Sequence, residues 1–417
     1  MPYDVKDIDL APSGERSIDW AMRHMPVLAN VRERFSDEKL FEGITVGTSL
    51  HIESTTAVFL LTLQEGGAEL AVTGSNPLST VDKVAAALAD KGINVYAWRG
   101  ENEEEYYRNI EKTLDHEPDF LIDDGADLIS YAHSEKGDIL SKIRGGSEET
   151  TTGVKRLRAM HKKNALEIPI IAVNDTPAKR LFDNRFGTGE STVNAVMSIT
   201  NSMIAGKNVI VVGFGPVGQG IAMRTDGLGA DVTVIETDPI RALEAAMQGF
   251  RVTNMDEASK YGDIFITATG NYKVIGKEHF EKMKDGAILC NSGHFNVEVD
   301  LEGLEEISTE SREILEDIKE YKLEDGRKLH VLAEGRLVNL AGEKSLGHPA
   351  EIMDMSFALQ ALSLEHMVKN DLPVKVHEVP AEIDRKVAQL KLEAMNIEIE
   401  ELTKEQMEYE ESWKLGT

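Results

Sequence analysis

The sequence predicts an α/β protein with parallel sheets covered by helices on both faces. Short apolar runs alternate with helical patterns along the first half of the chain, and a second alternating unit opens near Gly187. Several of the apolar runs end in polar, glycine-containing turns. Strands that alternate with helices of about 10–15 residues are typical of βαβ units, which build parallel sheets.

The first unit alternates strands with helices over residues 41–175. Its predicted strands cover 41–50, 68–74, 93–100, 118–125 and 168–175, and its predicted helices cover 54–67, 79–92 and 104–116. His51, Asp124, Asn174 and Asp175 each come at or just beyond the end of a strand. Because active sites in parallel sheets gather at the carboxyl ends of the strands, we expect these side chains to converge.

The second unit begins with a predicted helix over 189–207 that stops at Gly206. Residues 208–238 follow a strand, turn, helix and strand pattern, and further strands are expected at 262–270 and 285–295. The charged stretch 305–330 predicts a solvated helix and hairpin. The pattern is helical again over 350–369, and the acidic segment from Pro380 onward also favours helix.

Length and charge narrow the class of protein. The 417 residues suit two or three domains at ~100–200 residues each. Lysine and arginine total 45 against 73 acidic residues, and the resulting net charge of −28 argues against binding to nucleic acid or anionic lipid. The apolar run 56–63 is far shorter than the ~20 residues of a membrane span, and the acidic start lacks the features of a signal peptide. We therefore expect a cytoplasmic protein without membrane or nucleic-acid partners.

The cysteine count excludes whole classes of site. Cys290 is the one cysteine of the sequence, so there is no intramolecular disulfide and no multi-cysteine zinc or iron–sulfur centre. Its place at the end of an apolar strand indicates a small buried hydrophobe rather than a nucleophile. We predict no metal site.

A dinucleotide-binding fingerprint opens the second unit. Gly213, Gly215 and Gly218 form GxGxxG directly after the strand NVIVV and at the start of a predicted helix. This spacing permits a tight turn, close approach of the backbone to a pyrophosphate, and helix–strand packing. Glu236 follows 18 residues after Gly218, where a carboxylate accepts hydrogen bonds from the adenosine ribose and disfavours a 2′-phosphate. The sequence therefore predicts a Rossmann-type unit that binds NAD, with Arg241 as a mild signal for NADP.

Several dense polar motifs lie outside this fingerprint, whereas a plain dehydrogenase needs one catalytic base beside its dinucleotide unit. These motifs are SLHIESTTA, DDGADL, GSEETTTG, VNDTPAKRLFDN, NSGHF and RLVNLAGEKSLGHP. Taken in order, they resemble the S-adenosyl-L-homocysteine hydrolases over nearly the whole chain. The strings SEETTTGV, LFDN, GHFNVE and AEGRLVNL carry the resemblance most specifically.

The resemblance implies a redox-neutral reaction of the methyl cycle in one-carbon metabolism. In that family, bound NAD takes a hydride from C3′ of the nucleoside, and the resulting ketone acidifies the C4′ proton. Homocysteine then leaves by elimination, water adds, and the hydride returns. The implied activity is reversible hydrolysis of S-adenosyl-L-homocysteine to adenosine and L-homocysteine, with NAD as a recycled cofactor.

The resemblance also implies the catalytic residues. Lys179 and Asp183 would transfer the proton of the 3′-hydroxyl. Without the resemblance, their i,i+4 spacing would indicate a surface ion pair. Asp124 would act near C4′ and C5′, with His51 as its partner for proton transfer to water or thiolate. Glu149 would hold the ribose hydroxyls.

Further residues are assigned by the same resemblance. His294 and His348 match the family's two histidines around ribose and base, the first as a catalytic group and the second at the base. The implied cofactor contacts, beyond the fingerprint, are Thr150, Thr151, Thr152, Asn184, Thr269 and Asn339.

The sequence departs from the family pattern at the implied base site. Most members have Thr at the position of Glu53 and Glu or Gln at the position of Thr55, where that group accepts a hydrogen bond from the adenine amine. A hydroxyl donates as well as accepts, and hypoxanthine presents a C6 carbonyl and an N1–H. Glu53 and Thr55 could therefore suit S-inosyl-L-homocysteine, because a mismatched buried polar group costs ~1–3 kcal/mol.

The predicted organisation places the Rossmann-type NAD domain, residues 186–346, inside a larger doubly wound α/β substrate domain. Residues 1–185 and 347–384 form that substrate domain, and residues 385–417 form a short helical tail. The resemblance implies a homo-oligomer, usually a tetramer. Two other functions remain as alternatives: a plain NAD-dependent hydroxyacid dehydrogenase, and a catalytically silent NAD-binding partner protein.

Overall fold

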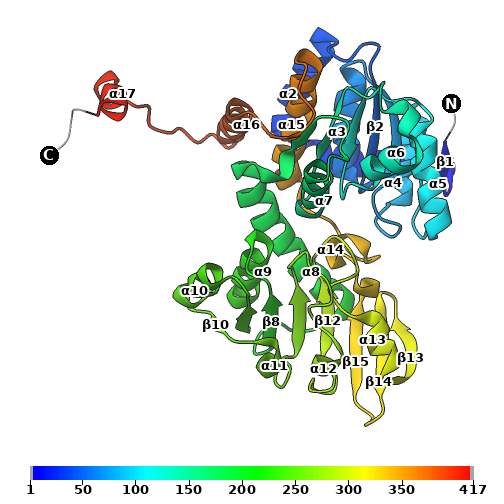
Figure 1. Ribbon diagram of the computed structural model, residues 1–417, viewed down its shortest axis with the longest axis vertical. Coiled ribbons are helices and arrows are strands. Elements are labelled where there is room, and N and C mark those ends of the chain that lie inside the picture. Colours follow the sequence, from blue (N-terminus) through cyan, green and yellow to red (C-terminus); the bar gives the residue numbers. More distant parts are fainter. Residues whose placement is uncertain (1–2, 414–417) are drawn as a thin grey trace.

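The computed structural model describes residues 3–413 and contains two eight-stranded sheets in separate lobes (Figure 1). Residues 1, 2 and 414–417 of the first and last predicted segments lie outside the described residues. The α/β class predicted from the sequence is confirmed. The domain boundaries themselves stay a prediction.

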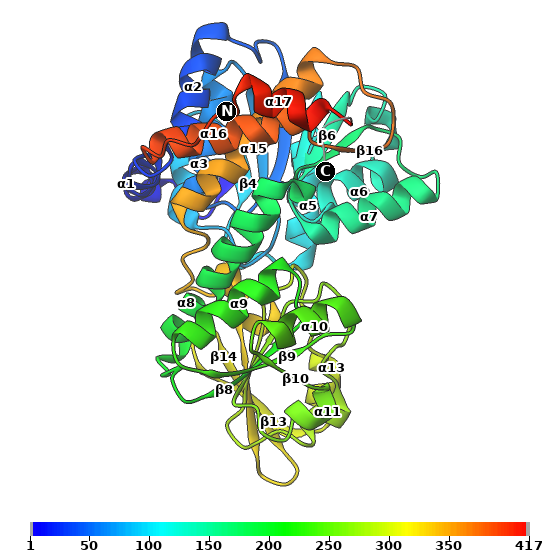
Figure 2. The same ribbon diagram turned by 90° about the vertical axis from the view of Figure 1, so that its left-hand side faces the viewer.

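The first sheet is parallel throughout and has the order β1-β4-β3-β2-β5-β6-β7-β16. Its last strand comes from the C-terminal part of the chain, which returns to this lobe after the second sheet is complete (Figure 2). The strands are β1 (Asp4–Val5), β2 (Thr45–Leu50), β3 (Glu69–Gly74), β4 (Asn94–Ala97), β5 (Phe120–Asp123), β6 (Gly145–Glu148), β7 (Ile170–Ala172) and β16 (Val376–Glu378).

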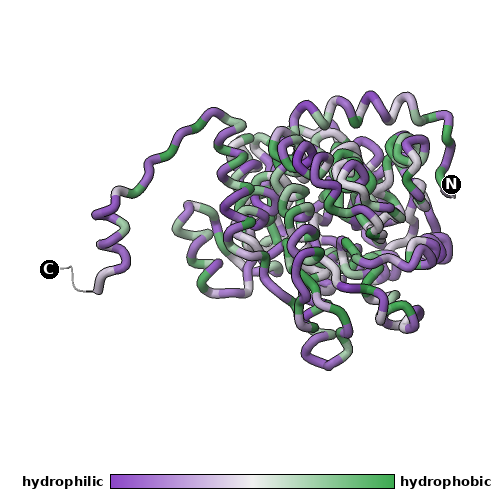
Figure 3. The backbone as a smooth tube through the Cα atoms, turned by 90° about the horizontal axis from the view of Figure 1, so that it is seen from above, coloured by the Kyte–Doolittle hydropathy of each residue, from purple (hydrophilic) through white to green (hydrophobic). Residues whose placement is uncertain are grey.

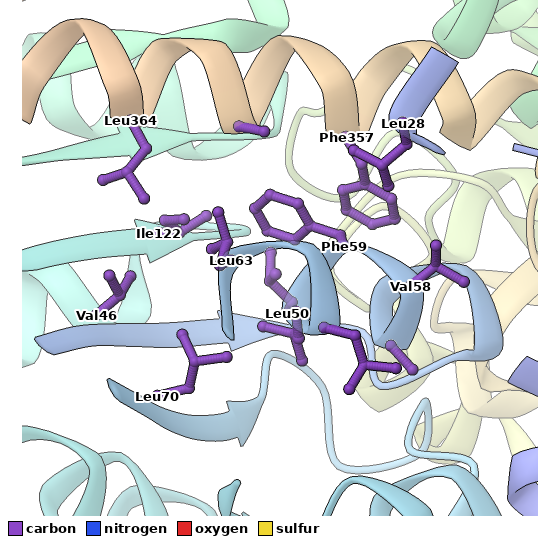
Figure 4. Packing of buried hydrophobic residues seen from close by; sticks show 14 of the residues in the cluster. Leu28, Val46, Leu50, Val58, Phe59, Leu63, Leu70, Ile122, Phe357 and Leu364 are labelled. Carbon is purple, nitrogen blue, oxygen red and sulfur yellow. The ribbon is translucent and has the colours of Figure 1, made fainter. Parts of the chain in front are cut away.

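Helices cover both faces of the first sheet. They are α1 (Ala11–Met22), α2 (Pro26–Glu38), α3 (Ser54–Glu65), α4 (Asp82–Asp90), α5 (Glu103–Leu114), α6 (Asp127–Glu135), α7 (Thr151–Lys162), α15 (Ala350–Lys369) and α16 (Ala381–Ala394). In the core, the Phe59 ring of α3 stacks on the Phe357 ring of α15 with centroids 4.9 Å apart (Figure 4). The returning segment therefore completes the core of the first lobe.

The second sheet has the order β10-β9-β8-β11-β12-β15-β14-β13, in which β8 carries the glycine fingerprint at its carboxyl end. The strand order reverses at β8, as in dinucleotide-binding folds. The strands are β8 (Asn208–Val212), β9 (Asp231–Ile235), β10 (Arg251–Val252), β11 (Ile264–Thr267), β12 (Ile288–Asn291), β13 (Ser308–Leu315), β14 (Ile318–Leu323) and β15 (Lys328–Leu332).

The helices of the second lobe are α8 (Thr188–Thr200), α9 (Pro216–Gly227), α10 (Pro239–Met247), α11 (Met255–Ala258), α12 (Lys277–Phe280), α13 (Leu301–Glu306) and α14 (Val338–Ala341). Helix α8 ends six residues before Gly206, contrary to the expected stop. Asn201 takes the left-handed conformation there, with φ 49°, and its N–H caps the Met197 carbonyl. Asparagine tolerates this conformation, so it ends the helix as glycine would.

The charged stretch 305–330 forms the predicted hairpin, but most of the predicted helix is strand. Strands β13 and β14 pair antiparallel, and β14 pairs antiparallel with β15, so the hairpin extends the second sheet at its edge. The side chains of β13 are largely exposed, which explains why its composition resembles a solvated helix.

The C-terminal tail leaves the first lobe after α16 and ends in the short helix α17 (Lys404–Glu411) (Figure 3). Apolar side chains of this tail are exposed, including Ile399 at 69% and Leu402 at 50%. Among the described residues, no helix has both the length and the apolar character that crossing a membrane requires.

Candidate active site

One cavity of about 1200 Å³ is lined by both lobes, at the carboxyl ends of β2, β5, β8 and β12. It brings together the residues assigned from the sequence to catalysis, cofactor and base, except Gly218, which is packed under the fingerprint turn. Those lining it are His51, Glu53, Thr55, Asp124, Glu149, Thr150, Thr151, Thr152, Lys179, Asp183, Asn184, Gly213, Gly215, Glu236, Thr269, His294, Asn339 and His348. Asn174 and Asp175 line it as well, so the expected convergence is present.

Asp124 lies between two histidines from different lobes. Its Oδ2 is 3.6 Å from His51 Nε2, and its Oδ1 is 3.6 Å from His294 Nδ1. All three residues are buried. Burial lowers the pKa of His51 to about 3 and that of His294 to about 4, so both imidazoles are neutral near pH 7.

The packing of His294 against the first lobe is close. Gly125 has φ +110°, and a Cβ placed there would lie 2.2 Å from His294 Nε2. Glycine is required at this position both for its conformation and for the approach of the ring. The loop after β5 is thereby shaped to receive a histidine from the loop after β12.

Lys179 is buried between two carboxylates. Its Nζ lies 2.8 Å from Asp183 Oδ2 and 2.9 Å from Glu149 Oε1. Lys179 and Asp183 belong to a π-helix, η4 (Lys179–Gly187), which leads directly into α8. Helical segments of this kind are rare and are frequent at functional sites.

The charges of this cluster follow from its burial and its ion pairs. Burial alone would lower the pKa of Lys179, but Asp183 and Glu149 raise it above its usual value. Burial alone would raise the pKa of Asp183, but Lys179 and His348 hold it well below its usual range. Burial raises the pKa of Glu149 to about 7, against the effect of Lys179. The resting site therefore contains an ammonium paired with the Asp183 carboxylate.

Helix α15 supplies two polar contacts that the sequence analysis missed. The Ser356 hydroxyl donates to Asp183 Oδ2 at 2.6 Å, and the Gln360 amide donates to Glu149 Oε2. Both side chains are buried in an otherwise apolar helix. Ser356 and Gln360 are four positions apart and therefore lie on one face of the helix. Polar residues with this spacing in an apolar helix are the sequence signal that could have identified them.

His348 contacts this cluster as well. Its Nδ1 lies 3.3 Å from Asp183 Oδ1, and its Nε2 lies 3.1 Å from the Thr188 hydroxyl. Glu53 approaches the same loop, because a Cβ on Gly347 would lie 2.1 Å from its carboxylate. Burial raises the pKa of Glu53 to about 7, while His348 lowers it.

The fingerprint turn has the geometry that close approach to phosphate requires. Gly213 has φ +100°, and a Cβ on Gly218 would lie 1.9 Å from the Gly213 carbonyl oxygen. No side chain caps the start of α9 at Gly215, so the first N–H groups of that helix are free to bind an anion. These features fit the pyrophosphate of a dinucleotide.

Glu236 lies at the end of β9, beside this turn. Its carboxylate accepts hydrogen bonds from the backbone N–H groups of Phe214 at 2.8 Å, Thr237 at 2.6 Å and Asp238 at 3.0 Å. Burial alone would raise the pKa of Glu236, but these donors lower it below its usual value. The group is therefore ionised and fixed at the edge of the cavity.

The other assigned cofactor residues form short polar chains. Thr150 caps α7 by accepting from the Gly153 N–H at 2.9 Å. Thr151 donates to Asn174 Oδ1 at 3.2 Å, and the Asn184 amide donates to the same oxygen at 3.0 Å. The Asn339 amide donates to Ser191 Oγ at 3.1 Å.

Glu298 is a buried acid that the sequence analysis did not single out, although it belongs to the string GHFNVE. Its Oε2 accepts from the Thr269 N–H at 3.0 Å and from the Thr269 hydroxyl at 2.6 Å, and its Oε1 accepts from the Gly270 N–H at 2.8 Å. It fixes the loop after β11 against the loop after β12. Cys290 is fully buried, as predicted, with Sγ 3.6 Å from the Phe265 carbonyl.

Comparison with known proteins gives matches along the whole chain. Residues 2–139 match the family described as S-adenosyl-L-homocysteine hydrolase, and residues 184–345 match its NAD-binding domain. The chain is 57% identical to S-inosyl-L-homocysteine hydrolase of Methanothermobacter thermautotrophicus, over all of both chains. It is also 57% identical to adenosylhomocysteinase of Thermococcus kodakarensis, over all of this chain and 99% of that protein. A third relative, adenosylhomocysteinase of Sulfolobus acidocaldarius, is 55% identical over all of both chains.

Proposed function

The chain belongs to the S-adenosyl-L-homocysteine hydrolase family, and we propose that it hydrolyses S-adenosyl-L-homocysteine reversibly to adenosine and L-homocysteine. It is an NAD-dependent hydrolase of the nucleosidyl–homocysteine thioether. The observation that carries the proposal is the common cavity, which is lined both by the dinucleotide turn and by the His51, Asp124, Lys179 and Glu149 side chains.

The residues present fit NAD. The uncapped start of α9 suits the pyrophosphate, and the ionised Glu236 suits a ribose diol while repelling a 2′-phosphate. When bound, NAD supplies a reversible hydride acceptor for C3′ of the nucleoside. Thr269, Asn184 and Asn339 line the cavity. Asn184 and Asn339 would orient the nicotinamide, and Thr269 would line the cofactor pocket.

Lys179 and Asp183 would handle the proton of the 3′-hydroxyl. Their ion pair is buried, so the 3′-oxygen meets a fixed ammonium and carboxylate without intervening bulk water. Lys179 would stabilise negative charge on that oxygen, and the Asp183 carboxylate would take its proton. Glu149, held by Gln360, would bind the ribose hydroxyls.

His51, Asp124 and His294 would act at the other end of the ribose. Asp124 would remove and return the C4′ proton once oxidation at C3′ has acidified it. His51, neutral near pH 7 with its Nδ1–H held by Ser79, would accept a proton through its Nε2, either from Asp124 to pass on to the departing homocysteine thiolate or from the attacking water. His294 would hold the carboxylate and cover the site from the second lobe.

S-inosyl-L-homocysteine is a second candidate substrate, and the cavity's Glu53 and Thr55 favour it. The Thr55 hydroxyl can donate to the hypoxanthine C6 carbonyl, and Glu53 can accept from N1–H. With adenine, Thr55 must instead accept from the C6 amine, and N1 needs a hydrogen-bond donor. A protonated Glu53 can be that donor, and its raised pKa permits this in part near pH 7.

Thiol release from the two substrates in parallel separates these candidates. We expect Thr55→Gln to increase kcat/KM for the adenosyl substrate relative to the inosyl one by about tenfold, because a glutamine amide oxygen accepts from the adenine amine. Ser54→Gln, one residue away and outside the cavity lining, is the matched control. An unchanged ratio in Thr55→Gln would remove Thr55 from base selection.

We propose further that the enzyme is a cytoplasmic homo-oligomer, usually a tetramer in this family. The apolar side chains exposed along the tail, among them Ile399 and Leu402, suit burial against a second copy of the chain. Light scattering on the full chain and on a chain ending at Met395 tests this. A monomeric full-length protein would contradict the proposal.

A further inference from the structure

The peptide unit of Gly125 is held from both ends by residues of neighbouring elements. Gly125 directly follows Asp124 in the loop between β5 and α6. Its N–H donates to Glu148 Oε1 at 2.9 Å, and its carbonyl accepts from the Arg156 guanidinium at 2.5 Å. Glu148 is the last residue of β6, and Arg156 belongs to α7. Neither side chain lines the cavity, so both hold the Asp124 loop from outside it.

The backbone of this loop requires such support. Gly125 has φ +110°, and Ala126 has φ 64°, a left-handed conformation that alanine rarely adopts. The ring of His294 packs directly over Gly125. Because two consecutive residues with positive φ are not favoured by local preference, contacts from outside the loop must stabilise them. The hydrogen bonds from Glu148 and Arg156 are contacts of this kind.

Glu148 also joins this loop to the one that follows β6. The same Oε1 accepts from the Thr150 N–H and from the Thr150 hydroxyl, each at 2.8 Å. A Cβ on Gly153 would collide with the Glu148 carboxyl, so that carboxyl is closely packed. One buried oxygen thus fixes the backbone next to Asp124 and the backbone next to Glu149.

Arg156 connects the other end of the Gly125 peptide to its surroundings. Its guanidinium pairs with Asp127 Oδ1 at 2.6 Å, and Asp127 is the first residue of α6. It also lies 5.6 Å from the centre of the Phe295 ring, which follows His294 in the second lobe. Arg156 therefore fixes the Gly125 carbonyl and contacts the loop that brings His294 over it.

We propose that Glu148 and Arg156 are positioning residues, which place Asp124 for proton transfer at C4′ by holding the Gly125 peptide between them. The catalytic part rests on the proposed function, whereas the support of the loop does not. Neither residue touches a reacting atom, so Asp124 itself still removes and returns the C4′ proton. Their loss should slow that step more than the hydride transfer from C3′, which depends on residues of η4.

Glu148 fills this role as a neutral hydrogen-bond acceptor. Burial and the neighbouring Asp123 and Asp124 carboxylates raise the pKa of Glu148 well above its usual value, although the Gly125 and Thr150 N–H groups lower it. Its Oε2 makes no hydrogen bond to any residue in the range 3–413. A glutamine keeps the accepting oxygen and places its NH₂ where a protonated carboxyl places its hydroxyl. Glu148→Gln should therefore preserve the role, and Glu148→Ala should abolish it.

Support of the loop is tested without catalysis, by amide hydrogen exchange on the NAD-loaded protein. Mass spectrometry follows segments 121–130 and 148–154. We expect Glu148→Ala to speed exchange in both segments by about tenfold, the effect of one lost hydrogen bond, and Glu148→Gln to leave it unchanged. Arg156→Met should speed exchange in the first segment. Unchanged exchange in both Glu148→Ala and Arg156→Met would overturn the support of the loop.

The catalytic part is tested with adenosine and with inosine in D₂O. NADH absorbance reports oxidation at C3′, and proton NMR reports deuterium entering at C4′. We expect Glu148→Ala and Arg156→Met to slow C4′ exchange by about tenfold or more, because Asp124 is misplaced, while NADH formation stays within threefold. Glu148→Gln should retain both steps. Glu135→Ala and Lys163→Ala, at exposed positions near the ends of α6 and α7, are the matched controls.

Circular dichroism and NAD content verify that each variant is folded. Arg156→Met keeps the test decisive if Glu148→Ala does not fold, since the Arg156 side chain is 35% exposed. Equal slowing of both steps, or C4′ exchange as fast as in the unaltered protein, would overturn the positioning role. A loss in Glu148→Gln as large as in Glu148→Ala would overturn the neutral acceptor.

Failure of the proposed function gives a different result. An unaltered protein that forms no NADH and exchanges no C4′ proton with either nucleoside would contradict that function. The amide-exchange comparison would then still decide whether Glu148 and Arg156 hold the loop.

Discussion

The Lys179 ammonium lies 2.8 Å from Asp183 Oδ2, one helical turn away in η4, and both groups are almost completely buried. A lysine with a lowered pKa can act as a base when neutral, but here Asp183 and Glu149 raise the pKa of Lys179. The pair is therefore an ammonium and a carboxylate in the resting protein. In the proposed mechanism, the 3′-hydroxyl would displace or share one of these contacts.

Removing the Lys179 charge should damage both activity and folding. We expect Lys179→Met to lower kcat/KM by ~10²–10⁴-fold, since a positioned proton-transfer group is lost. It leaves two buried carboxylates without their partner, which should cost about 3–5 kcal/mol in the free energy of unfolding. Urea unfolding and thiol-release assays measure the two effects, with the exposed Lys162→Met as control. Activity within threefold of the unaltered enzyme would exclude Lys179 from the reaction.

Glu236 should determine the preference for NAD over NADP. Its carboxylate is fixed by three backbone donors beside the fingerprint turn. We expect Glu236→Gln to weaken NAD binding by about 10–100-fold, the value of one charged hydrogen bond, while NADP binding changes little. Calorimetric titration with both dinucleotides measures this. Glu244→Gln, on the exposed face of α10, should change neither affinity, and an unchanged NAD-to-NADP ratio in Glu236→Gln would contradict the assignment.

Glu298 should act by positioning the cofactor loop and not by touching substrate. Glu298→Ala leaves the Thr269 and Gly270 donors without an acceptor, at a cost of about 1–3 kcal/mol in stability. We expect the Kd for NAD to rise several-fold, with kcat at saturating NAD nearly unchanged. Glu302→Ala, 86% exposed at its side chain, is the control. A large fall in kcat at saturating NAD would instead indicate a direct catalytic role.

Glu101 provides a test of pH-dependent stability away from the cavity. Burial raises its pKa to about 7, although the Trp98 N–H and the Asn109 amide lower it. Because the folded pKa exceeds the unfolded value of ~4.3, this group's stabilising contribution is complete below pH ~4.3 and is lost as the pH rises through about 7.

We therefore expect Glu101→Gln to gain stability relative to the unaltered protein between pH 4.5 and 8, by on the order of 3 kcal/mol. Chemical denaturation at several pH values measures the difference in the free energy of unfolding between the two proteins. Taking this difference cancels the contributions of other carboxyls whose pKa is raised, such as Glu53 and Glu149. Glu103→Gln, in the exposed first turn of α5, should show no such trend. A difference that is constant with pH would mean that the pKa of Glu101 is the same in the folded and unfolded states, which would contradict the raised pKa.

The strands whose local sequence pattern is distinctive could be predicted. The β2, β5 and β8 strands follow from continuous apolar runs bounded by turn residues. The carboxyl ends of β2 and β5 placed His51 and Asp124 at one edge of the first sheet, and the fingerprint followed β8 in the second sheet. The π-helical geometry of η4 was not predictable, because it is accompanied by long-range contacts: Ser356 and His348 reach Asp183 from more than 160 positions away.

Tertiary context also explains the other differences. Strand β13 is mostly exposed and charged, so only its pairing with β14 distinguishes it from a solvated helix. The role of Glu298 could not be predicted from sequence spacing, because its partners are backbone N–H groups of a loop 28 residues earlier in the chain. The roles of the residues that line the cavity remain predictions that the variants above test.

The most direct test supplies the NAD-loaded enzyme with S-adenosyl-L-homocysteine and with S-inosyl-L-homocysteine, and follows free thiol and NADH absorbance together. We predict that thiol accumulates to many equivalents of enzyme from at least one substrate, while NADH never exceeds one equivalent per site. NADH that accumulates in step with product would identify a dehydrogenase. An NAD-loaded protein that releases thiol from neither substrate would contradict the hydrolase and leave an NAD-binding protein without this activity.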